Sequence, residues 1–283
     1  MGGLKRTLAR LTRRFRPSPR QAAADHYEPL GADLGRVRLA AGLWLFVDPQ
    51  DGDISASLVQ RGYWERWTTL SVLSLIRPGD RIVEVGANLG YYTVLMADAV
   101  GPDGSVLALE ANPRLADLAQ RSLAQNGLDG HARVLAQAAL DRTGTVSFVT
   151  SRTVSGGGHV AVLDQPPFPD SEVIDAPAAR LDDLIEDRID LIRMDAEGSE
   201  PFVMAGAERI LSDNPDIIVC MEWSPIQIAS RTDPAAFVDR LAADGFRFWR
   251  MERDAKLTPL STDALKASGH TDIVACRRDP RRP

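Results

Sequence analysis

The chain has 283 residues, of which 44% are hydrophobic and 25% charged, and its formal net charge at pH 7 is −6. These values are typical of a globular protein large enough for one sizeable domain with extensions. Cys220 and Cys276 both lie in apolar, strand-like runs and belong to no Cys/His cluster. We therefore expect two buried, reduced thiols rather than a disulfide scaffold or a structural zinc site. No run approaches the roughly 18 apolar residues of a membrane-spanning helix.

The charge is distributed unevenly along the chain. Residues 1–20 contain seven basic side chains and no acid, a charge of +7. Since the whole chain carries −6, the remaining residues carry −13. This excess of acid argues against nucleic acid as the main partner of the folded body. We interpret residues 1–24 as a flexible basic arm, although leucines at helical spacing leave open contact with an anionic membrane or partner, or a targeting role. The prediction is a cytoplasmic protein, with peripheral contact at the inner membrane surface as the alternative.

An N-terminal extension is predicted over residues 25–76. It contains a strand pair over Val37–Val47 and a helix over Tyr63–Ile76. Apolar residues of this helix, Trp64 among them, are spaced near a period of 3.6, so we assign Trp64 to the core. Residues 77–276 form the predicted main domain. Residues 277–283 are interpreted as a second basic tail.

The main domain alternates short apolar strands with helices. Such alternation predicts an α/β, doubly wound and mostly parallel sheet of the Rossmann-like kind, which binds ligands beyond the carboxyl ends of its strands. The segment Thr143–Ala179 interrupts the alternation and is the expected insertion over the active site. Within it, His159 lies among glycines and is a candidate general base, the alternative being a solvated loop histidine. The expected strands are Arg81–Val85, Ser105–Leu109, His131–Gln137, Asp190–Met194, Ile217–Met221, Phe246–Met251 and Asp272–Cys276.

A glycine turn follows the first of these strands, in the pattern Glu84-x-Gly86-x-x-x-Gly90. Glycines are needed where a ligand approaches the backbone so closely that a Cβ would collide. The helix that starts there offers free N–H groups to an anion, and the preceding acid can face a cation. Glu110, at the end of the next strand, can accept hydrogen bonds from both ribose hydroxyls. The predicted cofactor contacts are Glu84, Gly86, Asn88, Gly90, Tyr91, Glu110 and Asn112.

A nicotinamide-dependent oxidoreductase is the rival interpretation. Its Gly-x-Gly-x-x-Gly fingerprint, counted from Gly86, would need glycine at Asn88 and at Tyr91. Neither position is glycine. The spacing favours S-adenosylmethionine (SAM), whose zwitterionic tail suits the acid and the helix start together.

An acidic run, residues 195–200, follows a later strand and precedes a helix. Asp195 lies where that strand meets the ligand crevice, and we assign it to orienting the acceptor or taking its proton. Glu197 has a similar case, whereas Glu200 is expected only to stabilise the helix start. Glu222 ends the next strand and can join them. Three such carboxylates can also bind a divalent cation, but we favour a metal-free site.

The sequence resembles the FkbM-type methyltransferases over roughly residues 62–223. The resemblance rests on an ordered series of blocks: VEVGANLGYY from Val83, LEANP from Leu109, NGL from Asn126, LIRMDAEGSEPFVMAG from Leu191 and, more weakly, DIIVCMEW from Asp216. It implies a class I SAM-dependent methyltransferase that methylates a hydroxyl oxygen of a sugar, glycan or polyketide-type natural product. Glu84 stands where the family's first block has Asp. A non-catalytic SAM-binding scaffold subunit remains the alternative to an enzyme.

Overall fold

The structure is a computed structural model that describes residues 26–162 and 168–280. The predicted basic arm and residues 281–283 of the predicted tail lie outside the described residues. None of the described helices combines the length and hydrophobicity that a bilayer span requires.

Eight of the described strands form the main sheet, in the order β14-β13-β15-β12-β11-β4-β5-β6. The part β6-β5-β4-β11-β12 is parallel and has the 3-2-1-4-5 order of doubly wound sheets, while β15 runs antiparallel between β12 and β13. The predicted fold class is confirmed. The strands are β4 (Arg81–Val85), β5 (Ser105–Glu110), β6 (Ala132–Ala136), β11 (Leu191–Met194), β12 (Ile218–Trp223), β13 (Arg247–Met251), β14 (Leu257–Leu260) and β15 (Thr271–Cys276).

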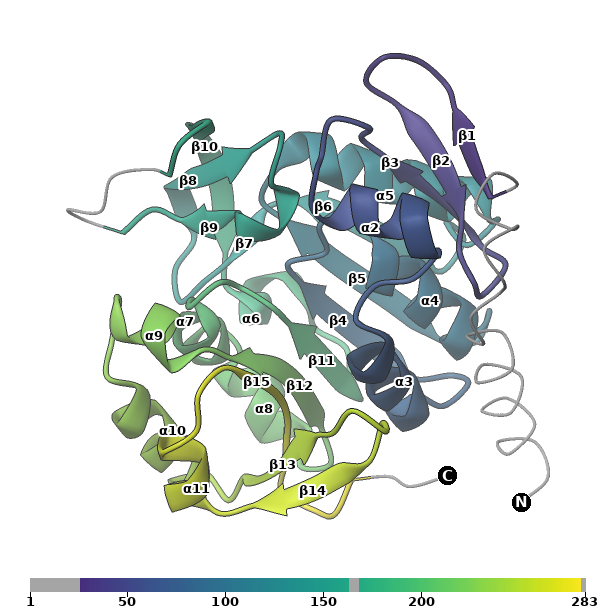
Figure 1. Cartoon of the computed structure of the whole chain (residues 1–283). Helices are drawn as coiled ribbons and strands as arrows, with labels where there is room; N and C mark the ends of the chain where they lie inside the picture. The colour runs from purple at the N-terminus through teal and green to yellow at the C-terminus, as the bar shows by residue number, and fades with distance from the viewer. Residues whose placement is uncertain (1–25, 163–167, 281–283) are drawn as a thin grey trace.

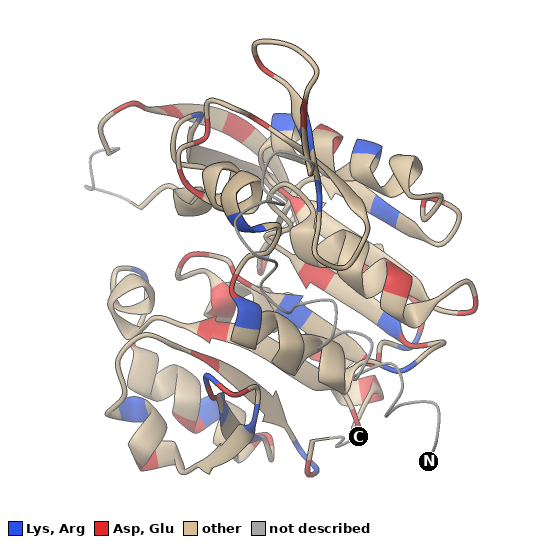
Figure 2. Cartoon of the chain, turned by 45° about the vertical axis from the view of Figure 1, so that its right-hand side comes forward, with Lys and Arg blue, Asp and Glu red and all other residues tan. Residues whose placement is uncertain are grey.

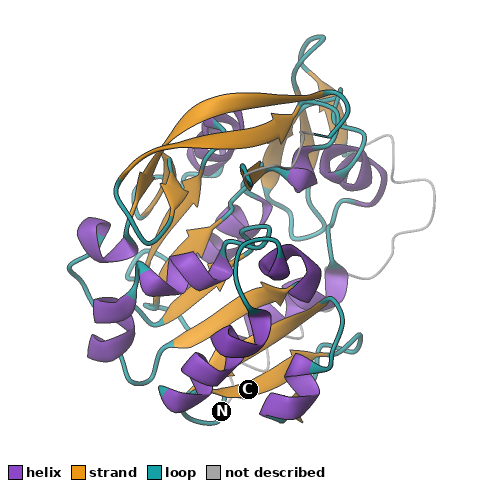
Figure 3. Ribbon diagram, turned by 90° about the vertical axis from the view of Figure 1, so that its left-hand side faces the viewer, coloured by secondary structure: helices purple, strands orange, loops and turns teal. Residues whose placement is uncertain are grey.

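Helices cover both faces of this sheet (Figures 1 and 3). Successive residues of a strand point to opposite faces, so Ile82 belongs to one apolar core and Val83 to the other. The first core contains residues of α3 (Arg66–Leu75), α4 (Tyr91–Val100) and α5 (Pro113–Gln125). The second contains residues of α6 (Leu181–Leu184), α7 (Glu200–Ala205), α8 (Glu208–Asp213), α9 (Pro225–Ala229), α10 (Pro234–Ala243) and α11 (Thr262–Lys266).

The helix predicted after the acidic run is divided into α7 and α8. A Cβ at Gly206, which separates them, would lie 1.9 Å from the carbonyl oxygen of Leu140. The cause of the break is therefore a contact with a distant part of the chain. Both thiols lie in the sheet, Cys220 on β12 and Cys276 on the adjacent β15, and both are free and buried.

The N-terminal extension forms a small antiparallel sheet of β1 (Tyr27–Pro29), β2 (Gly35–Arg38) and β3 (Trp44–Val47). This sheet packs on α5, where the Phe46 amide donates to Ser122 Oγ at 2.9 Å. A helix that the sequence did not suggest, α2 (Ile54–Arg61), follows it. The predicted helix over residues 63–76 begins only at Arg66, because Glu65 takes a left-handed conformation with φ 37°.

The insertion, residues 143–179, builds a second sheet beside the carboxyl ends of the main strands (Figure 1). Two carboxylates of the extension hold it there. Asp48 bonds to Arg152 at 3.1 Å, and Asp51 accepts from the Ser155 amide at 3.1 Å and from its hydroxyl at 2.8 Å. The insertion contributes β8 (Gly144–Ser151), a short 3₁₀ turn (Ser155–Gly157), β9 (His159–Val160) and β10 (Ser171–Ala179), and the sheet is completed by β7 (Ala138–Ala139), which precedes the insertion.

Candidate active site

A cavity opens at the carboxyl ends of β4, β5 and β11, where the order of the strands reverses. Residues 86–89 of the glycine turn line it, together with Glu110. Phe148 and Ser155 of the insertion and Trp64 of the extension supply further walls, so the extension and the insertion both complete the site. The assignment of Trp64 to the core alone is corrected, because this ring also lines the cavity.

The glycine turn is shaped by the neighbouring strand. Gly86 has φ 77°, and a Cβ there would lie 1.9 Å from the Asp195 carbonyl oxygen at the end of β11. At Gly90 a Cβ would lie 2.7 Å from the Cβ of Ala119 in α5. The nearest obstacles to these two side chains are therefore backbone and helix packing. The sequence argument assigned the glycines to the close approach of a ligand; the structure adds a second reason for them, which is packing within the protein.

Glu110 is held by the backbone on both sides. One carboxylate oxygen accepts from the Asn88 amide at 2.7 Å and the other from the Asn112 amide at 2.8 Å. Burial raises the pKa of Glu110, although these N–H groups act in the opposite direction. Each oxygen keeps further lone-pair capacity for a ribose hydroxyl. The Asn88 side chain donates to the Ser155 carbonyl at 2.8 Å and so joins the turn to the insertion.

Four residues predicted for the site do not line the cavity. Glu84 is fully buried below the turn, where it accepts from the Thr93 hydroxyl. Asn112 caps α5, and its amide group donates to Thr150. Gly90 lies against α5, and the His159 ring bonds to the Gly157 carbonyl at 2.9 Å. Their contacts therefore support the cavity from behind rather than reach into it.

Two tyrosines open α4 after the glycine turn. Tyr91 and Tyr92 both line the cavity and meet edge to face, with ring centroids 5.2 Å apart. The Tyr92 hydroxyl donates to Glu65 at 3.0 Å. Burial raises the pKa of Glu65 to about 7. The first residue before α3 thus adds a carboxyl group close to the site, which no local sequence signal indicated.

A buried arginine lies between the turn and the acids. Arg193, on β11, donates to the Asp195 carboxylate at 3.0 Å and to the Gly86 carbonyl at 3.2 Å. Its guanidinium carbon lies 4.3 Å from the centroid of the Tyr92 ring. Sequence reasoning missed this residue, although a charged side chain inside the apolar strand Leu191–Met194 was a usable signal.

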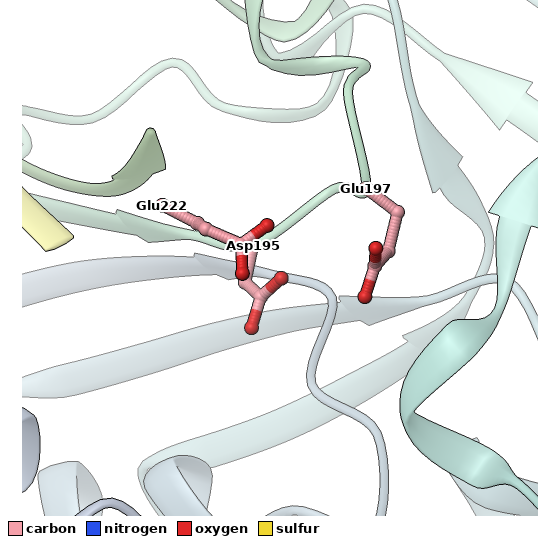
Figure 4. A group of neighbouring side chains, drawn as sticks. All are labelled: Asp195, Glu197 and Glu222. Atoms are coloured by element: carbon pink, nitrogen blue, oxygen red, sulfur yellow. The ribbon is translucent and has the colours of Figure 1, made fainter. Parts of the chain in front are cut away.

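Asp195, Glu197 and Glu222, hereafter the acidic cluster, meet at the ends of β11 and β12 (Figure 4). One carboxylate oxygen of each lies within 4.8 Å of the other two. Burial, with the charge of Asp195 nearby, raises the pKa of Glu197 to about 8 and that of Glu222 to about 9. Acidic segments of the ribbon gather at these strand ends, beside a basic one, in Figure 2.

Glu200 underlies the acidic cluster. It accepts from the Ala196 amide at 2.8 Å, which agrees with the expected role at the start of α7, and burial raises its pKa to about 7. Gln227 of α9 donates to the Glu197 carboxylate. Arg231 donates to the Glu197 carbonyl at 3.2 Å. The acidic cluster therefore has several acids close together, and Gln227 and Arg231 donate hydrogen bonds to Glu197.

The cavity suits a nucleoside that carries an amino-acid tail. Glu110 presents acceptors to ribose hydroxyls, apolar side chains such as Leu109 and Phe148 can flank a base, and the turn before α4 can bind a carboxylate. These features fit SAM.

Comparison with known proteins agrees with this fit. The model of the methyltransferase FkbM domain matches residues 84–248. Protein-L-isoaspartate O-methyltransferases of Methanopyrus kandleri and Aeropyrum pernix are 44% and 39% identical over 59 residues, which is 21% of this chain. The matched stretch spans about a quarter of those relatives, 26% and 23% of their lengths.

Solved structures of O-methyltransferases are also similar. One from Bacillus cereus, in complex with S-adenosylhomocysteine (SAH), is 16% identical, with a TM-score of 0.44 over 75% of this chain and 80% of that one. A SAM-dependent enzyme from Thermotoga maritima is 16% identical, with a TM-score of 0.43 over 86% of this chain and 78% of that one.

The fold and site define a SAM-dependent methyltransferase built on a doubly wound sheet. The chain belongs to the FkbM methyltransferase family, whose model matches more than half of it. SAM is its cofactor, and the resemblance seen in the sequence is confirmed. The oxidoreductase alternative is set aside by the same match.

Proposed function

We propose that the protein transfers the methyl group of SAM to a hydroxyl oxygen of a sugar, glycan or polyketide-type natural product. The observation that supports this most is the acidic cluster beside the cofactor cavity. A neutral alcohol must lose a proton as its oxygen is methylated, and carboxyl groups at this place can accept that proton or orient the hydroxyl.

The proposed reaction is an in-line displacement. The acceptor oxygen attacks the sulfonium methyl carbon, the carbon–sulfur bond breaks with its electron pair going to sulfur, and the hydroxyl proton passes to Asp195. The products are a methyl ether, SAH and a protonated carboxyl group. Glu197 and Glu222, whose pKa values of about 8 and 9 favour the protonated form at neutral pH, can donate hydrogen bonds to neighbouring oxygen atoms of the acceptor. His159 is left out of this assignment because it does not line the cavity.

The charge of the site favours an uncharged acceptor over a carboxylate. A protein-L-isoaspartate acceptor would bring an anionic carboxylate toward Asp195 and its acidic neighbours, and like charges at close range repel. A hydroxyl group meets no such repulsion. Its hydrogen atom can instead bond to the Asp195 carboxylate, whose side chain is 30% exposed.

The test is methyl transfer from radiolabelled SAM to a panel of acceptors. The panel contains monosaccharides, oligosaccharides, hydroxylated macrolides and, as the rival class, peptides with isoaspartate. We expect an alkali-stable ether product with a hydroxylated member only. An alkali-labile ester on the peptides would overturn the proposal. Saturable binding of SAH with no product from any member would favour the non-catalytic scaffold.

The location and partners of the chain complete this proposal. We place the enzyme in the cytoplasm, with a small-molecule or glycan acceptor, because its two buried cysteines are free thiols. The acidic charge of the body argues against nucleic acid as a partner. Fractionation of cells that produce the tagged full chain tests the location. Recovery with membranes that depends on residues 1–24 would instead support the alternative of peripheral contact.

A further inference from the structure

We propose that Arg193 is a positioning residue, whose guanidinium orients the Asp195 carboxylate for the acceptor's proton while anchoring it to the glycine turn. The proposal rests on the proposed function for the identity of that proton. The arrangement of Arg193 itself is given by contacts that involve no acceptor.

One planar group joins three elements of the site. Arg193 Nη2 contacts Asp195 at the end of β11, Nη1 contacts the Gly86 carbonyl at the end of β4, and the ring of Tyr92 in α4 lies against the guanidinium face. Because Arg193 engages Oδ2 of Asp195, Oδ1 is left for the acceptor. A shift of the glycine turn, which holds the cofactor, would therefore move the carboxylate as well.

The charge on Arg193 is permanent. Burial opposes it, but Asp195, Tyr92 and Glu84 together raise the pKa of Arg193 above its already high ordinary value. An isolated charge in this position would be very costly, so its counter-charges matter. Glu84 lies 3.8 Å from Nη1, yet burial raises its pKa to about 7, so it is only partly ionised near neutral pH. Asp195 is thus the principal partner of Arg193.

Acids face Asp195 from every element that packs around it. In the part of the chain that the structure describes, Arg193 is the cation in hydrogen-bond contact with Asp195, whereas Arg231 faces Glu197 and Glu200, and His270 faces Glu222. The acids are Glu65 before α3, Glu84 on β4, Glu110 on β5, Glu197 and Glu200 near α7, Glu222 on β12 and Asp272 on β15.

The experiment follows the Asp195 carboxyl group directly. In full-length protein labelled with [¹³C]aspartate and saturated with SAH, the Asp195 carboxyl signal is assigned by its absence in Asp195→Asn and compared between variants at one fixed pH. We expect Arg193→Gln to change the chemical shift of this signal, because the hydrogen bond from the guanidinium to the carboxylate is lost. Arg193→Lys should restore part of the original chemical shift. An unchanged signal in both variants would overturn the proposal.

Arg193→Lys also covers the case in which the Gln variant fails to fold. One ammonium group cannot hold both Asp195 and the Gly86 carbonyl in the geometry of a guanidinium fork. With an acceptor from the panel, we expect SAH affinity to be kept and kcat to fall about a hundredfold. Equal kcat in Asp195→Asn and in Asp195→Asn/Arg193→Lys is expected as well, since Arg193 acts through Asp195. A further loss of kcat in the double variant, beyond that of Asp195→Asn alone, would contradict this.

The chain offers a matched control at the other end of β11. Arg188 pairs with Asp190 at 2.6 Å with the same spacing of two residues, but its side chain is 70% exposed. Arg188→Gln should leave the Asp195 carboxyl signal unchanged, and a change as large as that in Arg193→Gln would show a general effect of charge. If the unmodified enzyme methylates no member of the panel, the proposed function fails, while the Asp195 signal still decides the role of Arg193.

Discussion

The two sides of the cavity are built in opposite ways. On the cofactor side, Glu110 has a backbone N–H on each oxygen, and Gly86 lies tightly against the next strand. On the acceptor side, the acidic cluster brings three carboxylates together, and Oε2 of Glu222 is buried without a hydrogen-bond partner among the described residues. The first side is preorganised by the fold and the second is under electrostatic stress. That difference suits a constant cofactor on one side and proton transfer on the other.

The largest effect is expected where the two sides touch. Gly86→Ala places a Cβ against the Asp195 carbonyl, and we expect a loss of at least about 4 kcal/mol in the free energy of unfolding or no folded protein. Gly101→Ala is the control, since Gly101 has φ 68° and no described residue lies within 4 Å of its Cβ position. Its ψ of −175° gives a backbone conformation that suits glycine, so the change should cost about 1–3 kcal/mol. Equal losses in urea denaturation would show that backbone conformation, rather than the clash, decides.

Asp195→Asn tests the acceptor side alone. The amide cannot take a proton, so we expect kcat to fall about 10²–10⁴-fold while SAH affinity, measured by calorimetry, is kept. Asp216→Asn, in an exposed ion pair with Arg278, is the control and should be neutral. Near-normal turnover of Asp195→Asn would end the assignment. Loss of activity on chelation, restored by magnesium or manganese, would instead make the acidic cluster a cation site.

Glu110→Ala tests the cofactor side. The loss of hydrogen bonds to a charged acceptor should weaken SAH binding about ten- to a hundredfold in calorimetry. Asn112→Ala is the matched control, because Asn112 caps α5 without lining the cavity. It should cost about 1 kcal/mol of stability and leave affinity nearly unchanged. A weaker affinity in Asn112→Ala than in Glu110→Ala would reverse the two roles.

The raised pKa values of the acidic cluster should be visible in the pH dependence of the free energy of unfolding. A carboxyl group whose pKa is raised by folding binds more protons in the native state, so its contribution is present at low pH and lost as pH rises through the folded value. With pKa values of about 8 for Glu197 and about 9 for Glu222, the free energy of unfolding should fall between pH 6 and 8. Glu222→Gln should make that decline shallower by up to about 1.4 kcal/mol per pH unit. The same dependence of unfolding free energy on pH in Glu222→Gln and in the unmodified protein would show that the pKa of Glu222 is not raised by folding.

The cofactor side was the more predictable from sequence. The glycine turn and Glu110 are local patterns at the ends of adjacent strands, and the structure places them together at the cavity. The positions of Glu65 and Trp64 depend on how the extension packs, and the break at Gly206 depends on Leu140, far away in the chain. Local patterns carry no such information. His159 shows the converse error, because a suggestive neighbourhood of glycines did not bring its ring to the cavity.

The two buried thiols can report when the sheet of this protein opens. Cys220 and Cys276 are 2% and 3% exposed on strands next to the acidic cluster, and burial raises the pKa of Cys276 to about 12, so little reactive thiolate is present in the folded state. An alkylating reagent should therefore modify them only when this half of the sheet separates. A ligand that binds the folded state alone slows that separation in proportion to its concentration. The rate of alkylation with increasing SAH then yields the affinity for the cofactor product before any acceptor is known.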